Sequence, residues 1–486
     1  RKAALMVKIM DNRHLFKKTK VICTIGPSSD NPETLAALAD AGMNIVRLNF
    51  SHGTHEEHLN RIKMVREVGE RIGLNLAIAL DTKGPEIRLG VFKNDSEDYK
   101  KGEIVYVVKA DIEGTHERFH ISCPELFEDL KAGNYILIND GKMRLTVLEN
   151  DGSEMKCRVE VNGPISSKKG CNCPGVKLSM PFLSKKDEDD LRFGCANDVD
   201  FIFASFVRRA DDVNAIRKIL IEEGKPKIQI IAKIENQEGY DNLDSILEAA
   251  DGVMVARGDL GVEIPTQLVP VYQKQIIKHA NIIGKPAITA THMLDSMTHN
   301  PRCTRAEASD VCNAVLDGSD GVMLSAESAA GEYPVEACEM MSSICEETES
   351  IIPYRDRLEI SKRSSKDTIQ DAIGISVSDA TLTLDNVGAV VAFTQGGTTA
   401  RRISKFRPCV PILAITFTKS TQRKLESYWG VTPIFSDVQN NMTNDDELAC
   451  MFAKDYGIKP GQLIILTAGY PTGEGSANMM KIIQVK

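Results

Sequence analysis

Acidic and basic side chains stand where short apolar runs end, and two of them are spaced for joint chemistry. Lys233 and Glu235 lie two residues apart in a run that reads as a strand, so their side chains point the same way. Asp259 follows the next such run and adds a second carboxylate. Two carboxylates leave most of an octahedral shell open, which is how Mg²⁺ is commonly held, and Mn²⁺ would also fit. The alternative is a Lys–Glu salt bridge with a remote aspartate.

Two further residues suit an anionic ligand. Arg47 presents a planar fork for phosphate or carboxylate, which lysine could not replace geometrically. Gly258 lacks a Cβ, so a ligand can approach the backbone N–H groups around it. A metal, a lysine, an arginine and free amides together suit phosphoryl transfer, in which catalysis is positioning plus charge stabilisation. The alternative is a structural ion-pair network.

These polar groups need a scaffold that brings the ends of many strands to one face. Apolar runs alternate with amphipathic stretches through roughly the first 350 residues, which is typical of a parallel sheet wrapped by helices. Eight such pairs predict a closed (β/α)8 barrel, whose chemistry sits at the C-terminal ends of the strands. The predicted strands are Lys20–Ile25, Asn44–Asn49, Leu76–Leu80, Val199–Ser205, Ile228–Ile234, Gly252–Ala256, Ala287–Ala290 and Gly321–Leu324. The predicted helices are Pro32–Ala41, His55–Ile72, Asp187–Ala196, Asp211–Glu223, Asn242–Ala249, Leu268–Ile283, Arg305–Leu316 and Val335–Thr348.

The barrel is interrupted by an insertion and followed by another domain. β-Rich runs separated by Asn-Asp-Gly turns predict an all-β lid, and a new alternation of helix and strand predicts a C-terminal α/β domain. We therefore expect an N-terminal extension at 1–17, the barrel at 18–85 and 182–350, the lid at 86–181 and the α/β domain at 351–486.

Composition and charge exclude several classes of protein. With 486 residues, 42% of them hydrophobic, and no low-complexity block, the chain is globular rather than fibrous or disordered. A net charge of -9 argues against a general nucleic-acid or anionic-membrane surface. The apolar runs reach only strand length, and the first ten residues lack the apolar core of a secretory signal. Twelve scattered cysteines predict reduced thiols and a cytoplasmic location.

Five motifs in one order resemble pyruvate kinase. They are Ile45–Gly53, Leu80–Arg88, Ile231–Asn236, Val255–Gly261 and Thr304–Glu307, and the similarity runs from about Lys18 to the C-terminus. The resemblance implies transfer of the phosphoryl group of phosphoenolpyruvate to ADP, giving pyruvate and ATP. It also implies Mg²⁺ (or Mn²⁺) and K⁺ as cofactors and a homotetramer.

The resemblance assigns roles around the reacting group. Lys233 stabilises the transferring phosphoryl group, Glu235 and Asp259 bind the divalent ion, and Arg47 contacts the phosphate of phosphoenolpyruvate. The amides of Gly258 and Asp259 hold the substrate carboxylate. Thr291 lies near the carbon that is protonated, and a water relay through it is expected because a hydroxyl is a poor acid.

A few positions depart from the commoner pattern. His292 stands where many relatives have Gln and adds a titratable group near the proton transfer. Ala326 and Ser328 stand where Gly and Thr are frequent. None of these changes removes Lys233 or a proposed metal ligand, so we expect activity.

The resemblance also implies sites for K⁺ and for the nucleotide. Glu86 is typical of members that need K⁺, whereas members that do not need it carry Lys there, since a fixed ammonium can replace a mobile cation. Lys186, which the resemblance assigns to the nucleotide, could instead be a solvent-exposed residue at the start of a helix. The implied K⁺ ligands are Asn49, Ser51, Asp81 and Thr82, the last through its carbonyl, and the nucleotide contacts are Asn49, His52, Arg88 and Lys186.

A Gly-rich turn in the C-terminal domain resembles the effector loop of the family. It follows a strand and opens a helix, so free N–H groups and hydroxyls are available to a phosphate. The second loop, 468–475, lacks the Trp-Arg pair that some relatives use for fructose 1,6-bisphosphate, and a phosphorylated sugar or a nucleotide is the expected ligand. The effector residues are Thr394, Gly396, Gly397, Thr398 and Thr399.

Two other functions fit parts of the sequence. A Mg²⁺-dependent lyase or aldolase could use the same barrel, and a catalytically silent sensor could use the last domain alone. Arg88 and Lys186 favour a nucleotide over the lyase, and intact Lys233, Glu235 and Asp259 argue against silence.

Overall fold

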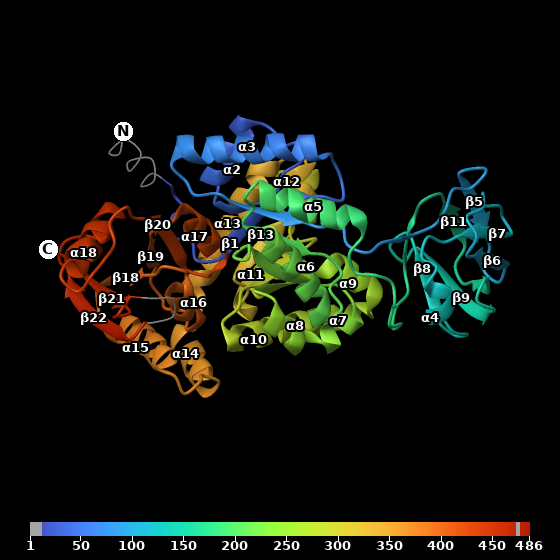
Figure 1. The fold of residues 1–486 in the computed structure, drawn as a ribbon. Helices are drawn as coiled ribbons and strands as arrows, with labels where there is room; N and C mark the ends of the chain where they lie inside the picture. The colour runs from blue at the N-terminus through green and yellow to red at the C-terminus, as the bar shows by residue number, and fades with distance from the viewer. Residues whose placement is uncertain (1–11, 473–476) are drawn as a thin grey trace.

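Eight buried parallel strands close into a barrel in the middle of the molecule (Figure 1). The computed structural model describes residues 12–472 and 477–486. Each predicted barrel strand is confirmed, with ends that shift by one or two residues. The strands, in order around the barrel, are β1 (Lys20–Thr24), β2 (Met43–Asn49), β3 (Ala77–Asp81), β13 (Phe201–Ala204), β14 (Gln229–Ile234), β15 (Gly252–Ala256), β16 (Ala287–Ala290) and β17 (Gly321–Leu324).

The helices that surround the barrel begin and end at residues suited to those positions. Thr54, Ser184 and Thr304 each form a capping box at a helix start, and Gly73 and Gly284 end helices in the left-handed conformation. The predicted helices are confirmed. They are α2 (Pro32–Asp40), α3 (His55–Ile72), α5 (Lys185–Ala196), α6 (Ala210–Glu222), α8 (Leu243–Ala249), α10 (Val269–Ile283), α11 (Arg305–Asp317) and α13 (Pro334–Ile351), and the shorter helices α7 (Gln237–Asp241), α9 (Arg257–Glu263) and α12 (Ala326–Ala329) follow strand ends.

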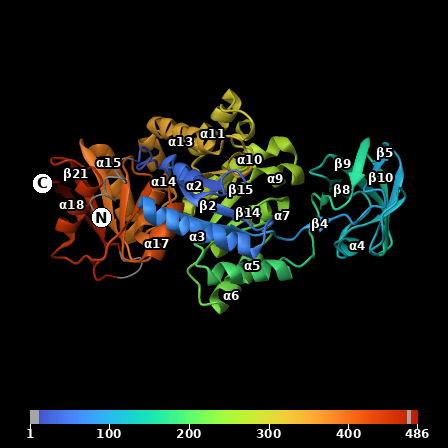
Figure 2. The same ribbon diagram turned by 90° about the horizontal axis from the view of Figure 1, so that it is seen from above.

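The lid is a separate sheet that extends to one side of the barrel (Figures 1 and 2). The β-rich runs predicted at 103–108, 135–139, 143–149 and 155–161 are confirmed as strands, and five short strands that the sequence pattern missed complete the sheets. Asn172 of the lid donates to Glu263 on α9 at 2.7 Å, which ties the lid to the barrel. The seven-stranded sheet consists, in order, of β4 (Ile87–Arg88), β12 (Gly170–Asn172), β8 (Tyr135–Ile138), β9 (Met143–Asn150), β10 (Glu154–Val159), β6 (Ile104–Val108) and β7 (Arg118–His120). A second, two-stranded sheet pairs β5 (Ser96–Tyr99) with β11 (Gly163–Ser166). The lid also contains one short helix, α4 (Leu126–Asp129).

The C-terminal part of the chain forms a five-stranded sheet with helices on it. Four strands are parallel, and β22 is an antiparallel edge strand. The segment after Pro353 is helical over Tyr354–Arg363, and strands β20 and β22 were not predicted from the sequence. The strands are β20 (Val431–Phe435), β19 (Ile412–Thr416), β18 (Val387–Phe393), β21 (Leu463–Ala468) and β22 (Met479–Gln484), and the helices are α14 (Tyr354–Arg363), α15 (Ile369–Thr383), α16 (Thr398–Lys405), α17 (Lys419–Lys424) and α18 (Asp445–Asp455). The residue limits of the domains stay a prediction.

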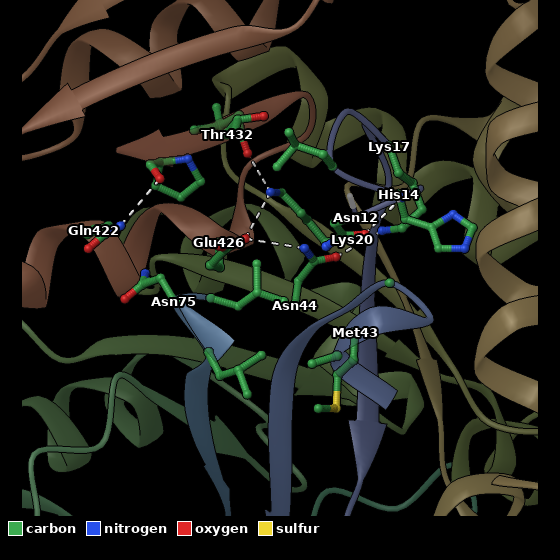
Figure 3. A pocket seen from close by; sticks show the side chains of 18 of the residues that line it. Asn12, His14, Lys17, Lys20, Met43, Asn44, Asn75, Gln422, Glu426 and Thr432 are labelled. Carbon is green, nitrogen blue, oxygen red and sulfur yellow. Dashed lines mark hydrogen bonds and ion pairs between the residues drawn. The ribbon is translucent and has the colours of Figure 1, made fainter. Parts of the chain in front are cut away.

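A buried ion pair joins this C-terminal sheet to the floor of the barrel. Lys20, at the start of β1, donates to Glu426 at 3.0 Å and to the carbonyl of Val431, and both charged side chains are almost fully buried. Asn44 also donates to Glu426 (Figure 3). These residues line a cavity of about 80 Å³ at the N-terminal ends of the strands, the end of a (β/α)8 barrel that serves stability rather than catalysis.

The thiols and the helices agree with two further expectations from the sequence. All twelve cysteines are free, as predicted, and eight of them are buried in the barrel or lid cores. Within residues 12–472 and 477–486, no helix is both long and apolar enough to cross a membrane.

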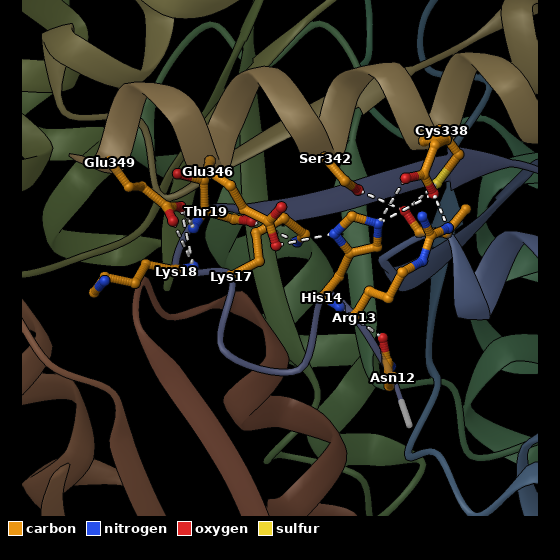
Figure 4. A network of polar contacts seen from close by, with 12 residues as sticks. Asn12, Arg13, His14, Lys17, Lys18, Thr19, Cys338, Ser342, Glu346 and Glu349 are labelled. Atoms are coloured by element: carbon orange, nitrogen blue, oxygen red, sulfur yellow. Dashed lines mark hydrogen bonds and ion pairs between the residues drawn. The ribbon is translucent and has the colours of Figure 1, made fainter. Parts of the chain in front are cut away.

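His14 fastens the segment before β1 to helix α13 (Figure 4). Its Nδ1 lies 2.9 Å from Glu346 and its Nε2 lies 3.1 Å from Glu339, and the side chain is only 4% exposed. The Glu346 carboxylate, followed by that of Glu339, raises the pKa of His14 above its ordinary value of 6.5 against the effect of burial. A protonated His14 donates to both carboxylates.

We expect His14→Gln to destabilise the protein at pH 6 but not at pH 9. A pKa raised by folding contributes stability that is fully present below pH ~6.5 and is lost as pH rises through the folded pKa. The loss at pH 6 should be about 2 kcal/mol, typical of buried hydrogen bonds to charged groups. Urea unfolding midpoints of both proteins, read across this pH range, measure the difference.

Arg13→Gln is the matched control for this experiment. Arg13 pairs with Glu339 at 3.0 Å but stays charged throughout the pH range, so its loss should have the same small effect at each pH. A His14→Gln difference that is equally large at pH 9 would contradict a protonated His14.

Candidate active site

The barrel interior places the polar residues of the site directly above an apolar plug. Ile45, Ala79, Phe203 and Ile231 fill the interior, and side chains alternate between the two faces of a strand. Residues two positions further along therefore point to the same interior: Arg47 on β2, Asp81 on β3, Ser205 after β13 and Lys233 on β14.

Lys233 is the centre of a buried network at the C-terminal ends of the strands. Its Nζ lies 3.0 Å from Asp81, 2.9 Å from the Ser205 hydroxyl and 3.5 Å from Glu235. Arg47 donates through Nε to the other Asp81 oxygen at 2.6 Å. Burial opposes the charged form of Lys233, but Asp81 and Glu235 raise its pKa above the ordinary value. The ammonium is therefore retained without solvent.

Glu235 and Asp259 form a pair of buried carboxyls whose negative charge is offset only in part by Lys233. Glu235 is 1% exposed, and burial, with a contribution from the Asp259 carboxylate, raises its pKa to about 8. Burial also raises the pKa of Asp259, whose side chain is hydrogen-bonded to Glu235. In the described part of the chain, no group of three or more His, Cys, Asp or Glu has the arrangement of a metal site. A divalent ion would therefore need ligands from water or substrate as well.

Asp81 has a different environment from the other two carboxylates. Burial works against its charge, but Arg47 and then Lys233 hold its pKa below the ordinary value. It is ionised and acts as the counter-ion of both cations. Sequence reasoning assigned Asp81 to K⁺ alone and did not identify this role.

Gly258 and Thr291 meet at the edge of the network. The Gly258 N–H donates to the Thr291 hydroxyl at 2.6 Å. Both residues line a cleft of about 910 Å³ that also includes Asp259, His292 and Asp140 of the lid. The structure thus brings Lys233, Arg47, Glu235, Asp259, Gly258 and Thr291 to one end of the barrel.

The four predicted K⁺ ligands lie at the C-terminal ends of β2 and β3 (Asn49, Asp81) and on the loops that follow them (Ser51, Thr82). Asn49 is next to Asp81 in the strand register, and the Ser51 N–H donates to the Asn49 Oδ1 at 3.1 Å. The Thr82 carbonyl accepts from Ser205 at 2.6 Å. These oxygens are the donor type that a monovalent cation requires, and a carbonyl has a second lone pair to offer.

The predicted nucleotide residues divide into two groups. Lys186 donates to the Phe50 carbonyl at 2.9 Å and pairs with Asp190, so it lies beside the segment that carries Asn49 and His52. His52 is exposed. Arg88, on β4, instead donates to Glu86 at 2.9 Å and to the Lys168 carbonyl, where the lid meets the barrel.

The Gly-rich turn of the C-terminal domain has the predicted strand-to-helix geometry. It follows β18, and Gly397 adopts a positive φ of 95° at the start of α16. The Thr394 hydroxyl accepts from the Gly397 N–H at 3.0 Å. Gly396 is exposed, Thr398 is half-buried and Thr399 is buried. The second loop lies partly outside the described residues.

Some residues that support the site were given no role from the sequence. Ser205 and Thr24 contact Lys233 and Arg47, at 2.9 Å in each case. Their position two residues beyond an interior apolar residue was a signal that could have identified them. Glu327 accepts from the amides of Leu294 and Ser325, so it supports backbone rather than ligand.

Comparison with known proteins gives one family. A family model described as "Pyruvate kinase, barrel domain" matches residues 16–338, and one described as "Pyruvate kinase, alpha/beta domain" matches residues 371–483. A "Pyruvate kinase" of Staphylococcus epidermidis is 50% identical over 473 residues, which is 96% of this chain and 80% of that protein. Those of Staphylococcus aureus and Staphylococcus haemolyticus are 49% identical over the same shares of both chains. The chain therefore belongs to the pyruvate kinase family of phosphotransferases.

Proposed function

We propose that this enzyme transfers the phosphoryl group of phosphoenolpyruvate to ADP, giving pyruvate and ATP. The observation that carries the proposal is the buried Lys233 ammonium, held by Asp81 and Glu235 at the barrel mouth. A cation fixed in this way stabilises charge on a phosphoryl group in transit without reorganising. Arg47, fixed by Asp81 and Thr24, is placed to contact the same group.

Glu235 and Asp259 are the residues proposed to hold a divalent ion, Mg²⁺ or Mn²⁺. Their raised pKa values support this, because two adjacent buried carboxyls that share one nearby cation, Lys233, are stabilised when a divalent ion binds. The bound ion would neutralise part of the negative charge on the phosphoryl oxygens.

Thr291 is proposed to relay a proton to the substrate carbon through water. Its Oγ accepts from the Gly258 amide, so the hydroxyl hydrogen is free to point into the cleft. The substrate carboxylate is proposed to bind the Gly258 and Asp259 amides, where it competes with Thr291 for the Gly258 N–H. Asn49, His52, Arg88 and Lys186 are proposed to contact the nucleotide.

A coupled assay for pyruvate tests the proposed function. Pyruvate should form only when both phosphoenolpyruvate and ADP are present. A lyase would release product without ADP, and a silent sensor would release none. Absence of pyruvate with the wild-type enzyme would overturn the proposal.

We expect the enzyme to lose most of its rate when K⁺ is replaced by tetramethylammonium. The proposed K⁺ ligands are Asn49, Ser51, Asp81 and Thr82, and a large organic cation cannot fit oxygens spaced for K⁺. Glu86→Lys should lessen this dependence, because a fixed ammonium replaces the mobile cation. Initial rates of both proteins in the two salts at equal ionic strength are the measurement.

Glu160→Lys is the matched control for Glu86→Lys. Glu160 accepts from the Arg158 Nε at 2.9 Å, just as Glu86 accepts from the Arg88 Nε at 2.9 Å. It lies after β10 in the lid, whereas Glu86 directly precedes β4. It should leave the K⁺ dependence unchanged. An undiminished wild-type rate in tetramethylammonium would contradict the K⁺ site.

The C-terminal turn around Thr394, Gly396, Gly397, Thr398 and Thr399 is proposed to bind a phosphorylated effector, a sugar or a nucleotide. The strand-to-helix turn supports this, because no side chain caps the start of α16. A thermal-shift screen with both classes of compound tests it.

We further propose a homotetramer, testable by sedimentation, and a cytoplasmic location, which the twelve free thiols support.

A further inference from the structure

The turn after β16 carries backbone strain at two successive residues. Thr291 has a φ of 71° and His292 a φ of 53°, and both values lie in the left-handed region that residues other than Gly seldom adopt. Each costs roughly 1 kcal/mol or more, so surrounding contacts must hold the turn in place.

Arg257 supplies those contacts from the end of the neighbouring strand. Its Nη2 donates to the Thr291 carbonyl at 2.8 Å and lies 3.0 Å from the Met293 sulfur. Its Nε donates to the Ala290 carbonyl at 3.3 Å. The guanidinium thus holds the residues on both sides of the strained turn.

Asp310 on α11 orients the guanidinium. Its two oxygens accept from Nη1 at 2.7 Å and from Nη2 at 2.8 Å, a bidentate pair. Gln273 accepts from Nη1 at 3.4 Å. The five N–H groups of Arg257 are thereby all directed at protein acceptors, and none is left for a substrate.

We propose that Arg257 and Asp310 are positioning residues that hold Thr291 for proton transfer to the substrate carbon. The inference rests on the proposed function, in which Thr291 relays that proton. Arg257 also directly precedes Gly258, whose N–H donates to the Thr291 hydroxyl. One guanidinium therefore fixes the Thr291 backbone from one side while the next residue fixes its side chain.

Arg257→Lys removes the fork but keeps the charge. An ammonium cannot reach the Ala290 and Thr291 carbonyls and both Asp310 oxygens together, so the Thr291 turn should relax. We expect kcat to fall about 10²-fold, as for a misplacement of about 1 Å, while KM for phosphoenolpyruvate changes little. Because the substrate phosphate is bound elsewhere, the loss should fall on the proton-transfer step.

Two readouts report that step directly. The first is exchange of pyruvate methyl protons with D₂O, followed by NMR, which reverses the protonation of the substrate carbon. It should slow by the same factor as kcat. The second is the solvent isotope effect on kcat, which should increase as proton transfer becomes limiting. A merely structural defect would lower the active fraction, and so slow turnover and exchange alike, but it would leave the solvent isotope effect unchanged.

Asp310→Asn provides a second variant that keeps size and one acceptor oxygen. It should give a smaller loss of the same kind, and the double variant should lose no more than Arg257→Lys alone, because both residues act through one contact set. Arg217→Lys is the matched control. Arg217 also donates to two backbone carbonyls and one carboxylate, those of Ile228, Ala249 and Asp251, at the barrel floor, and its loss should leave kcat and proton exchange unchanged.

The outcomes separate the inference from the proposed function. No pyruvate from the wild-type enzyme would remove the proposed function and the inference with it. An active wild type whose Arg257→Lys and Asp310→Asn variants keep normal proton exchange would overturn the inference alone. So would additive losses in the double variant, or a loss of kcat with an unchanged isotope effect.

Discussion

Replacing Lys233 by methionine should lower kcat by about 10³-fold or more, the magnitude seen when one preorganised charge is removed from a transition state. The Lys233 ammonium is buried, and its partners hold it at one place rather than releasing it to solvent. Methionine has a similar length and no charge. KM for phosphoenolpyruvate should change less than kcat, since the ammonium acts most strongly on the charge that develops during transfer.

The same variant should also lose stability. Removing one partner of a buried ion pair costs about 3 kcal/mol or more, because Asp81 and Glu235 keep their burial and lose a cation. Arg47 still compensates Asp81, so the protein should fold. Urea unfolding of the variant separates this loss from the loss of turnover.

Lys20→Met is the control that the chain itself provides. Lys20 is as buried as Lys233 and pairs with Glu426 at 3.0 Å, but it lies at the opposite end of the barrel. The Lys20→Met variant should lose about as much unfolding free energy as Lys233→Met, but its kcat should stay at the wild-type value. A Lys233→Met enzyme that retains more than a tenth of the wild-type kcat would contradict the role of Lys233.

The barrel could be predicted from the sequence because each of its strands is a mostly apolar run, with polar residues mainly near its ends. Ile231 and Val253, for example, lie in runs that are buried on both faces, and parallel sheets covered by helices have this pattern. The lid strands β4, β7 and β12 could not be predicted, since two or three residues give no periodicity. Their pairing depends on partners far along the chain.

The proposed site was partly predictable for a similar reason. Lys233 and Glu235 share a strand end, so their spacing alone predicted that they meet. The contacts of Arg257 with Thr291 and Asp310 join two separate strand-helix units, and no local pattern signals them. Nor does spacing show that Asp81 serves two cations at once.

Glu235→Gln should weaken binding of Mn²⁺ strongly and lower kcat by about 10²-fold or more. The amide keeps the size and one oxygen of the carboxylate but removes the charge, and a hard divalent cation depends on that charge. Without metal, the neutral amide should be tolerated, because burial already favours the neutral form of Glu235, whose pKa is about 8. The unliganded variant should therefore be at least as stable as the wild type.

Two measurements test whether Glu235→Gln weakens Mn²⁺ binding while it leaves the metal-free protein at least as stable as the wild type. Electron paramagnetic resonance counts free Mn²⁺ in a titration, and thermal melting with and without Mn²⁺ reports how far the ion stabilises each protein. The wild type should gain melting temperature with Mn²⁺, and Glu235→Gln should gain little. Glu349→Gln is the matched control, since Glu349 is also buried with a raised pKa but accepts from the amides of Lys18 and Thr19. It should bind Mn²⁺ normally, and equal Mn²⁺ affinity in all three proteins would remove Glu235 from the metal site.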